Sequence, residues 1–128
     1  MELLFVYGTL KRGCINHIYL TGGEYLGRAY APGYTLYVLF VPYAVRAPPS
    51  CRVYGELYRV PSRVLEEIDE LEIPAGYARV RAKVASLRGG EAEAWIYAVP
   101  GEETSNCLAD RYRCPSPDMD LTNSSYFA

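Results

Sequence analysis

The sequence predicts an α+β domain built on a mixed or largely antiparallel sheet. Most segments rich in tyrosine, valine and leucine are either short apolar runs or alternate with polar residues, as β-strands do, and short turns join them. Only two segments have helical features. Strands with local connections and few helices are typical of the α+β class, and 128 residues suffice for one domain with a sizeable core.

The first predicted strand is the apolar run 3–6, which lacks polar alternation and is therefore expected to be buried on both faces. Gly8 and Thr9 follow it. Glycine lets the backbone turn sharply and lets a ligand approach the peptide groups. The loop after the strand therefore suits a carboxylate or carbonyl oxygen, although a glycine here also fits a simple strand end.

The next part of the chain mixes helix and strand patterns. A short helix is expected over 14–20, with Asn16 as its candidate N-cap. Strands are expected over 24–40, interrupted by the Ala-Pro-Gly sequence at 31–33. Three prolines make 41–50 a predicted loop that crosses one end of the sheet.

The second half predicts a strand, a helix and a hairpin. The strand covers 52–60 and contains Gly55, which indicates a close approach of another backbone. The helix opens with a proline and runs over 61–71. Its apolar face consists of Val64, Leu65, Ile68 and Leu71. A Gly-Gly turn then joins two strands predicted over 77–87 and 91–99.

A C-terminal tail, 101–128, is predicted after a domain of residues 1–100, because the tail has few periodic apolar residues. Whether it is ordered stays open. The chain has four cysteines: Cys14, Cys51, Cys107 and Cys114. One expectation is a disulfide of Cys107 or Cys114, with each other or with Cys51, which would fix the tail. The other is four free thiols and a mobile tail.

The composition favours a cytoplasmic protein with no membrane or nucleic-acid partner. No apolar run reaches the length of a membrane span, and the start of the chain lacks the pattern of a signal peptide. The net charge is −2 with scattered arginines, so a nucleic-acid surface is not indicated. The absence of glutamine suggests a thermophilic source, in which intracellular disulfides are plausible.

Three segments in the same order resemble the gamma-glutamylcyclotransferase-like family, nearest to its gamma-glutamylamine cyclotransferase branch. They are Val6-Tyr7-Gly8-Thr9-Leu10-Lys11-Arg12-Gly13 with Asn16-His17, Val53-Tyr54-Gly55-Glu56-Leu57-Tyr58, and Ile68-Asp69-Glu70-Leu71-Glu72 with Tyr77-Ala78-Arg79. The resemblance covers about residues 1–100 and implies a small, curved, barrel-like sheet with about two flanking helices. The family usually has a glycine after its catalytic glutamate, whereas Ile73-Pro74 follows Glu72 here.

The resemblance implies an enzyme that releases 5-oxoproline and a free amine or amino acid from a small gamma-glutamyl compound. The substrate's own amine attacks its γ-carbonyl, so neither a metal nor a cofactor is expected. Glu72 corresponds to the catalytic general acid/base. The substrate-binding residues implied are Tyr7, Gly8, Thr9 and Leu10 in the loop, and Tyr77 and Arg79 after the helix.

The residues themselves leave alternatives open at these positions. Glu72 either points into a cleft, where desolvation raises its pKa, or is one more exposed glutamate. Arg79 either pairs with Glu72, Glu56 or a substrate carboxylate, or forms a structural ion pair. Glu56 is expected to have a structural partner, and Asp69 to pack or cap locally.

His17 is the only histidine, and with Cys14 it offers two ligands where zinc needs three or four, which argues against a metal site. The alternative to an enzyme is a non-catalytic module that binds a small carboxylate in the same cavity.

Overall fold

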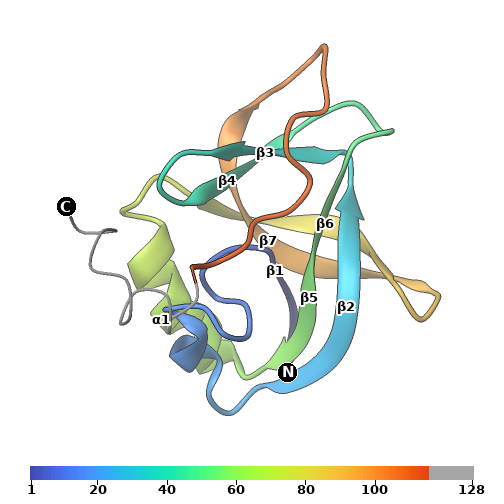
Figure 1. Ribbon diagram of the computed structural model, residues 1–128. Helices are drawn as coiled ribbons and strands as arrows, with labels where there is room; N and C mark the ends of the chain where they lie inside the picture. The colour runs from blue at the N-terminus through green and yellow to red at the C-terminus, as the bar shows by residue number, and fades with distance from the viewer. Residues whose placement is uncertain (116–128) are drawn as a thin grey trace.

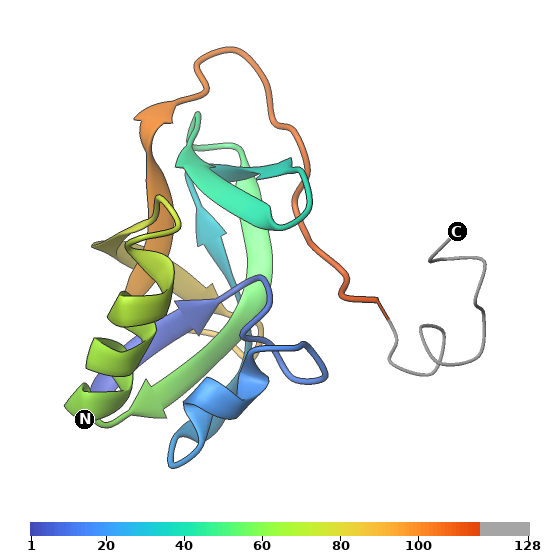
Figure 2. The same ribbon diagram turned by 90° about the vertical axis from the view of Figure 1, so that its left-hand side faces the viewer.

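The chain forms a closed five-stranded barrel with one α-helix packed beside it (Figures 1 and 2). The structure is a computed structural model and describes residues 1–115. The elements in chain order are β1 (Glu2–Val6), the 3-10 helix η1 (His17–Leu20), β2 (Glu24–Pro32), β3 (Tyr34–Val38), β4 (Pro42–Arg46), β5 (Arg52–Val60), α1 (Ser62–Glu72), β6 (Ala78–Ser86) and β7 (Glu91–Glu102).

The barrel closes through the first and last strands. The strand order is β1-β5-β2-β6-β7, and β1 also pairs in parallel with β7, where Leu4 lies opposite Trp95. The other barrel pairings are antiparallel, so the sheet is mixed. The predicted α+β barrel is therefore confirmed, and residues 1–115 contain one α-helix and one short 3-10 helix.

The segment 41–50 was expected to be a loop, and this prediction is wrong. Pro42–Arg46 forms β4, which pairs antiparallel with β3 and in parallel with β7. Proline is tolerated because Pro42 is the first residue of the strand, where a missing N–H interrupts little of the ladder. The other two prolines, Pro48 and Pro49, follow the strand.

Two hydrophobic cores lie on opposite faces of β1. Phe5 belongs to a cluster formed by alternate residues of the barrel strands, including Val53, Val84 and Ile96. The adjacent residues Leu4 and Val6 belong to a second cluster, under α1, which contains Leu10, Leu20, Tyr58, Val60, Val64, Leu65, Ile68, Tyr77 and Tyr97. The prediction that this strand is buried on both faces is confirmed.

Gly55 has the close backbone approach that its position in a strand predicts. A Cβ atom there would lie 2.2 Å from the carbonyl oxygen of Val6 and 2.8 Å from the ring of Phe5. Only glycine allows β5 to approach β1 this closely, at the point where β1 leads into the loop of residues 7–13.

The chain after β7 returns across the barrel, and we call residues 103–115 the strap (Figure 1). The N–H of Leu36 donates to Ala109 O at 2.9 Å, and the N–H of Tyr54 donates to Asp110 O at 2.7 Å. Disulfides join Cys107 to Cys51 and Cys114 to Cys14. The first pair is among those predicted, whereas Cys14 is not among the predicted partners of Cys114. Residues 116–128 of the predicted tail lie outside the described part.

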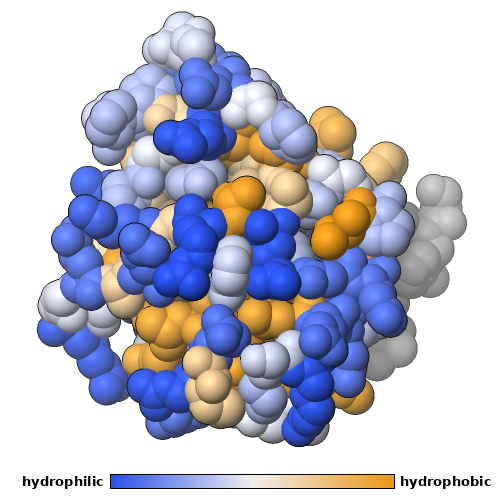
Figure 3. Space-filling model, turned by 180° about the vertical axis from the view of Figure 1, so that it is seen from behind, coloured by the Kyte–Doolittle hydropathy of each residue, from blue (hydrophilic) through white to orange (hydrophobic). Residues whose placement is uncertain are grey.

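The face opposite to that of Figure 1 mixes hydrophilic and hydrophobic side chains, with a hydrophilic band across its middle (Figure 3). Within residues 1–115, no helix has the length and apolar character needed to cross a membrane.

Candidate active site

Glu72 is the last residue of α1 and lies on its buried face. Val64, Ile68 and Glu72 follow one another at intervals of four, so they form one stripe along the helix. The side chain of Glu72 is only 9% exposed, whereas the next residue, Ile73, is 52% exposed. A carboxylate therefore occupies a place in the apolar stripe that a core side chain would ordinarily fill.

A tight turn after α1 brings Tyr77 back beside Glu72. The N–H groups of Ala75 and Tyr77 both donate to Glu72 O, at 3.0 and 3.2 Å. Gly76 has a φ of 105°, a left-handed conformation that L side chains rarely adopt. The turn therefore needs this glycine, even though Ile73-Pro74 stands where the family usually has one directly after its glutamate.

The loop after β1 lies across the cavity from Glu72. Lys11 N–H donates to Gly8 O at 3.1 Å, which closes a turn. Asn16 holds the loop twice: its side-chain amide donates to Thr9 Oγ1 at 3.0 Å, and its backbone N–H donates to Thr9 O at 2.9 Å. Among residues 1–115, no hydrogen bond uses the N–H of Thr9 or Leu10. These two groups remain available to a ligand.

Asn16 thus differs from its predicted role. The helix expected over 14–20 is reduced to η1, and Asn16 makes no side-chain capping bond to it. Its amide is already occupied by the hydroxyl of Thr9, so it fixes the loop instead.

Glu72 and the loop line one cavity. Its walls are formed by Phe5, Val6, Tyr7, Gly8, Thr9, Leu10, Pro42, Glu72, Tyr77 and Tyr97. The cavity has a volume of about 30 Å³ and opens to solvent. The structure thus brings together Glu72, Tyr77 and all four loop residues that the sequence predicts for the site.

None of the three tyrosines in the wall donates a hydrogen bond to Glu72. Tyr7 donates to Tyr97 O at 2.5 Å, and Tyr77 donates to Pro42 O at 2.6 Å. Tyr97 donates to Asp69 Oδ1 at 2.7 Å. Burial raises the pKa of each phenol, so all three are neutral around Glu72.

Burial raises the pKa of the Glu72 carboxyl group from its usual 4.5 to about 7. Within the described residues no hydrogen-bond donor or cation contacts this carboxylate to offset the loss of water. A carboxyl group that titrates near neutral pH can take up and return a proton at little cost. This is the property that general acid–base catalysis needs.

Arg79 lies outside this cavity. Its guanidinium makes two hydrogen bonds with Asp69, at 2.8 and 3.0 Å, and stacks over Trp95 at 4.4 Å. Burial raises the pKa of Asp69, but hydrogen bonds from Arg79 and Tyr97 outweigh it and hold the pKa below its usual value. Arg79 therefore forms a structural ion pair with Asp69 and does not pair with Glu72 or Glu56. Glu56 accepts hydrogen bonds from Arg12 N–H and Tyr58 OH.

Four residues that line the cavity are not among the predicted site residues: Phe5 and Val6, at the end of β1, and Pro42 and Tyr97. Pro42 was assigned to a loop, and its ring packs so closely on Gly8 that a Cβ there would lie 2.8 Å from Pro42 Cγ. Tyr97 lies in β7 opposite Arg79, and nothing in its local sequence distinguishes it from the other buried tyrosines. The alternation in 42–46 could have identified a strand, but only the strand pairing places Tyr97.

Fold and cavity together describe a small barrel protein with one partner-free, buried glutamate facing a glycine-containing loop. The family model for gamma-glutamyl cyclotransferase, AIG2-like, matches residues 4–117. The chain therefore belongs to this family. A relative from Methanocaldococcus jannaschii is 37% identical over 103 residues, which cover 78% of this chain and 86% of the relative.

Two further comparisons agree. The human gamma-glutamylaminecyclotransferase is 42% identical over 98 residues, covering 68% of this chain and 64% of the human protein. The crystal structure of an uncharacterized protein from Pyrococcus horikoshii is similar with a TM-score of 0.66 at 28% identity, covering 98% of both chains. The resemblance predicted from the three segments is confirmed.

Proposed function

We propose that the protein is a gamma-glutamyl cyclotransferase that releases 5-oxoproline and a free amine or amino acid from a small gamma-glutamyl compound. Membership of the family supports a cyclotransferase-like activity. The observation that carries the finer proposal is the buried Glu72 carboxylate, with its raised pKa, in one cavity with the loop from Tyr7 to Leu10.

In the proposed reaction, the substrate's α-amino nitrogen attacks its own γ-carbonyl carbon. Glu72 accepts a proton from this nitrogen as the new C–N bond forms. The carbonyl oxygen becomes an oxyanion, and the free N–H groups of Thr9 and Leu10 are the donors available to it. Glu72 then returns the proton to the leaving nitrogen as the old C–N bond breaks, which yields the cyclic 5-oxoproline and the free amine.

The chemistry needs no nucleophile from the protein, because the substrate carries its own. Holding the glutamyl chain in its cyclic, near-attack shape can supply roughly 7–11 kcal/mol. General acid–base catalysis adds a factor of about 10²–10⁴. The cavity is small, with a volume of about 30 Å³, and opens to solvent. A gamma-glutamyl substrate would therefore extend beyond it.

The other predicted substrate-binding residues take different parts in this proposal. Tyr7 and Tyr77 form walls whose hydroxyls are tied to the backbone. Arg79 acts as a positioning residue, because it holds Asp69 on the last turns of the helix that carries Glu72.

The alternative is a non-catalytic module that binds a small carboxylate. The feature that favours this alternative is Ile73-Pro74, which stands where the family usually has a glycine. The two functions differ in turnover, because a module would bind gamma-glutamyl compounds without cleaving them.

A screen of gamma-glutamyl amides and gamma-glutamyl dipeptides for 5-oxoproline release tests the proposal. We expect turnover of at least one class, which would also identify the leaving amine. Binding of these compounds by calorimetry with no 5-oxoproline formed would reject the enzyme and support the module.

A further inference from the structure

A second cavity lies between the strap and strands β2 and β5, and its lining is strongly basic. Four cationic side chains line it: Lys11, Arg28, Arg111 and Arg113. Among residues 1–115, Glu56 is the only carboxylate in the lining. The inner volume is about 270 Å³, close to the lower limit of about 300 Å³ for small-molecule sites. We call this the basic cavity.

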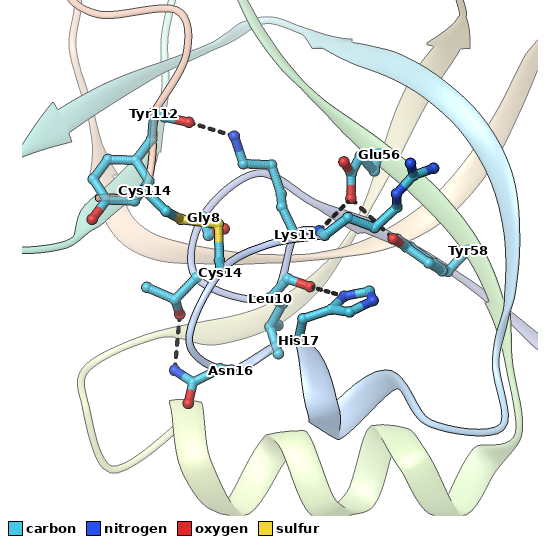
Figure 4. Close-up of a disulfide and its surroundings, with 12 residues drawn as sticks. Gly8, Leu10, Lys11, Cys14, Asn16, His17, Glu56, Tyr58, Tyr112 and Cys114 are labelled. Carbon is cyan, nitrogen blue, oxygen red and sulfur yellow. Dashed lines mark hydrogen bonds between the residues drawn. A yellow bond between two sulfur atoms is a disulfide. The ribbon is translucent and has the colours of Figure 1, made fainter. Parts of the chain in front are cut away.

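The charge of the basic cavity contrasts with that of the chain, whose formal net charge is −2. The one carboxylate is already engaged, because Glu56 Oε1 accepts hydrogen bonds from Arg12 N–H and from Tyr58 OH, both at 3.0 Å (Figure 4). Asp110 lies 3.5 Å from Arg111 but outside the lining. Within the described residues, Arg28 and Arg113 form no ion pair.

Gathering like charges in this way is unfavourable unless an anion is present. Partial burial lowers the pKa of Lys11, and the nearby Arg113 and Arg111 lower it further, against the opposing effect of Glu56. The ammonium group donates to Tyr112 O, a neutral acceptor in the strap (Figure 4). Within residues 1–115, the Lys11 ammonium group therefore has a hydrogen-bond acceptor but no salt-bridge partner.

Arg111 and Arg113 are about a hundred residues from Lys11 in sequence, and the strap brings them to the same cavity. The disulfide between Cys114 and Cys14 fixes the strap three residues after Lys11 (Figure 4). The guanidinium of Arg111 stacks over the ring of Tyr54, with Cζ 4.6 Å from the ring centroid. The disulfide and the stacking on Tyr54 thus hold Arg111 and Arg113 near Lys11 although their charges repel.

We propose that the basic cavity is a binding site for a small anion carrying two or more negative charges, either a phosphate compound or a polycarboxylate. The arginines present planar forks that suit both kinds of oxyanion. The site is separate from the Glu72 cavity, since the two share no lining residue. It adjoins the same loop, in which Lys11 N–H closes the turn onto Gly8 O.

Calorimetric titration of the full chain with inorganic pyrophosphate and with citrate, at constant ionic strength, tests the proposal. We expect one equivalent of at least one anion to bind. Arg28→Gln combined with Arg113→Gln should weaken this binding at least tenfold. The matched control, Arg59→Gln with Arg63→Gln, removes the same charge from exposed positions outside the cavity and should leave binding within about twofold.

The result also distinguishes the two kinds of ligand, since binding of only one anion assigns the site to its chemistry. No binding of either anion at about 10 mM overturns the proposal. Equal weakening in both double variants also overturns it, because the effect would then be one of overall charge.

A second measurement is independent of the variants. Amide chemical shifts of the wild-type protein should change at Gly55 and Tyr112 when the anion is added. Changes centred on Tyr77 and Tyr97 would place the anion in the Glu72 cavity and reject the separate site. Neither readout depends on cyclotransferase activity.

Discussion

Asp69 and Glu72 lie three residues apart at the end of α1, and their carboxyl groups have opposite pKa shifts. Asp69 accepts two hydrogen bonds from Arg79 and one from Tyr97, and its pKa is lowered. Glu72 is buried without such partners, and its pKa is raised to about 7. One helix end thus carries a fixed anion and, one turn further, a carboxyl group free to exchange its proton.

We expect Glu72→Gln to lower kcat/KM for gamma-glutamyl substrates at least 100-fold, because the amide fills nearly the same space but cannot accept a proton. Circular dichroism should show an unchanged fold. Glu70→Gln, an exposed neighbour on α1, is the matched control and should keep full activity. A Glu72→Gln rate above about a third of wild type would contradict the assignment.

The activity should depend on pH through Glu72. The group must be ionised to accept a proton, and its pKa is about 7. We therefore expect kcat/KM to rise about tenfold per pH unit below neutrality and to level off above it. The check is a profile between about pH 5 and 9, and a rate that is constant across pH 5–7 would show that another group is the base.

Stability should change in the opposite direction. A carboxyl group whose pKa is raised on folding holds its proton more tightly in the folded state. Its contribution to the free energy of unfolding is therefore fully present below about pH 4.5, and this stabilisation is lost as the pH rises through about 7. The shift from 4.5 to about 7 corresponds to at most about 3 kcal/mol.

Glu72→Gln should therefore be about as stable as wild type at pH 4 and more stable at pH 8, by up to about 3 kcal/mol. Urea unfolding at both pH values measures this difference. A variant that is less stable than wild type at pH 8 would show that the ionised carboxylate has a stabilising partner in solution.

The ion pair of Arg79 and Asp69 should support the helix end without contacting the substrate. Both side chains are less than a quarter exposed, so we expect a coupling energy of about 1–3 kcal/mol in a double-mutant cycle of Arg79→Gln and Asp69→Asn. The exposed pair of Arg81 and Glu93 is the control, with an expected coupling below about 0.5 kcal/mol.

The same Arg79→Gln variant separates positioning from binding. KM should change by less than about twofold, with the larger effect in kcat. A large rise in KM with kcat unchanged would return Arg79 to the substrate-binding role that the family resemblance implies.

The strap should contribute to stability through its disulfides. Replacing Cys14 and Cys114 together by serine should lower the free energy of unfolding by about 2–4 kcal/mol, as measured by urea unfolding without reductant. The pair of Cys51 and Cys107 serves as the comparison. Thiol counting on the unfolded protein, protected from air, should find no reactive thiol among the four cysteines, and four would contradict both bonds.

Local patterns predicted those parts of the fold that depend on neighbouring residues. The buried strand before Gly8 and the hairpin between β6 and β7 follow from apolar runs and turn glycines. The hairpin of β3 and β4 was missed, because prolines are ordinarily evidence against a strand. Pro42 is compatible with β4 because it is the first residue of the strand. Closure of the barrel depends on Leu4 meeting Trp95, and no local pattern encodes this contact.

The site shows the same division. The helical spacing of Val64, Ile68 and Glu72 is present in the sequence and could have placed the glutamate on the buried face. The prediction instead put Leu71 on the apolar face, one residue away. The proposed catalytic role of Glu72 rests on the family resemblance. That none of Tyr7, Tyr77 and Tyr97 donates a hydrogen bond to its carboxylate is decided by tertiary packing, which gives the three hydroxyl groups other acceptors.

The bond between Cys14 and Cys114 spans 100 positions of the chain. Every strand from β2 to β7 therefore lies within one covalent ring. A protease that cuts the chain once, for example in the turn after Leu87, leaves two pieces that stay joined by sulfur. The nicked molecule would keep its mass apart from one added water and separate only on reduction, so damage to an exposed turn need not release any part of the barrel.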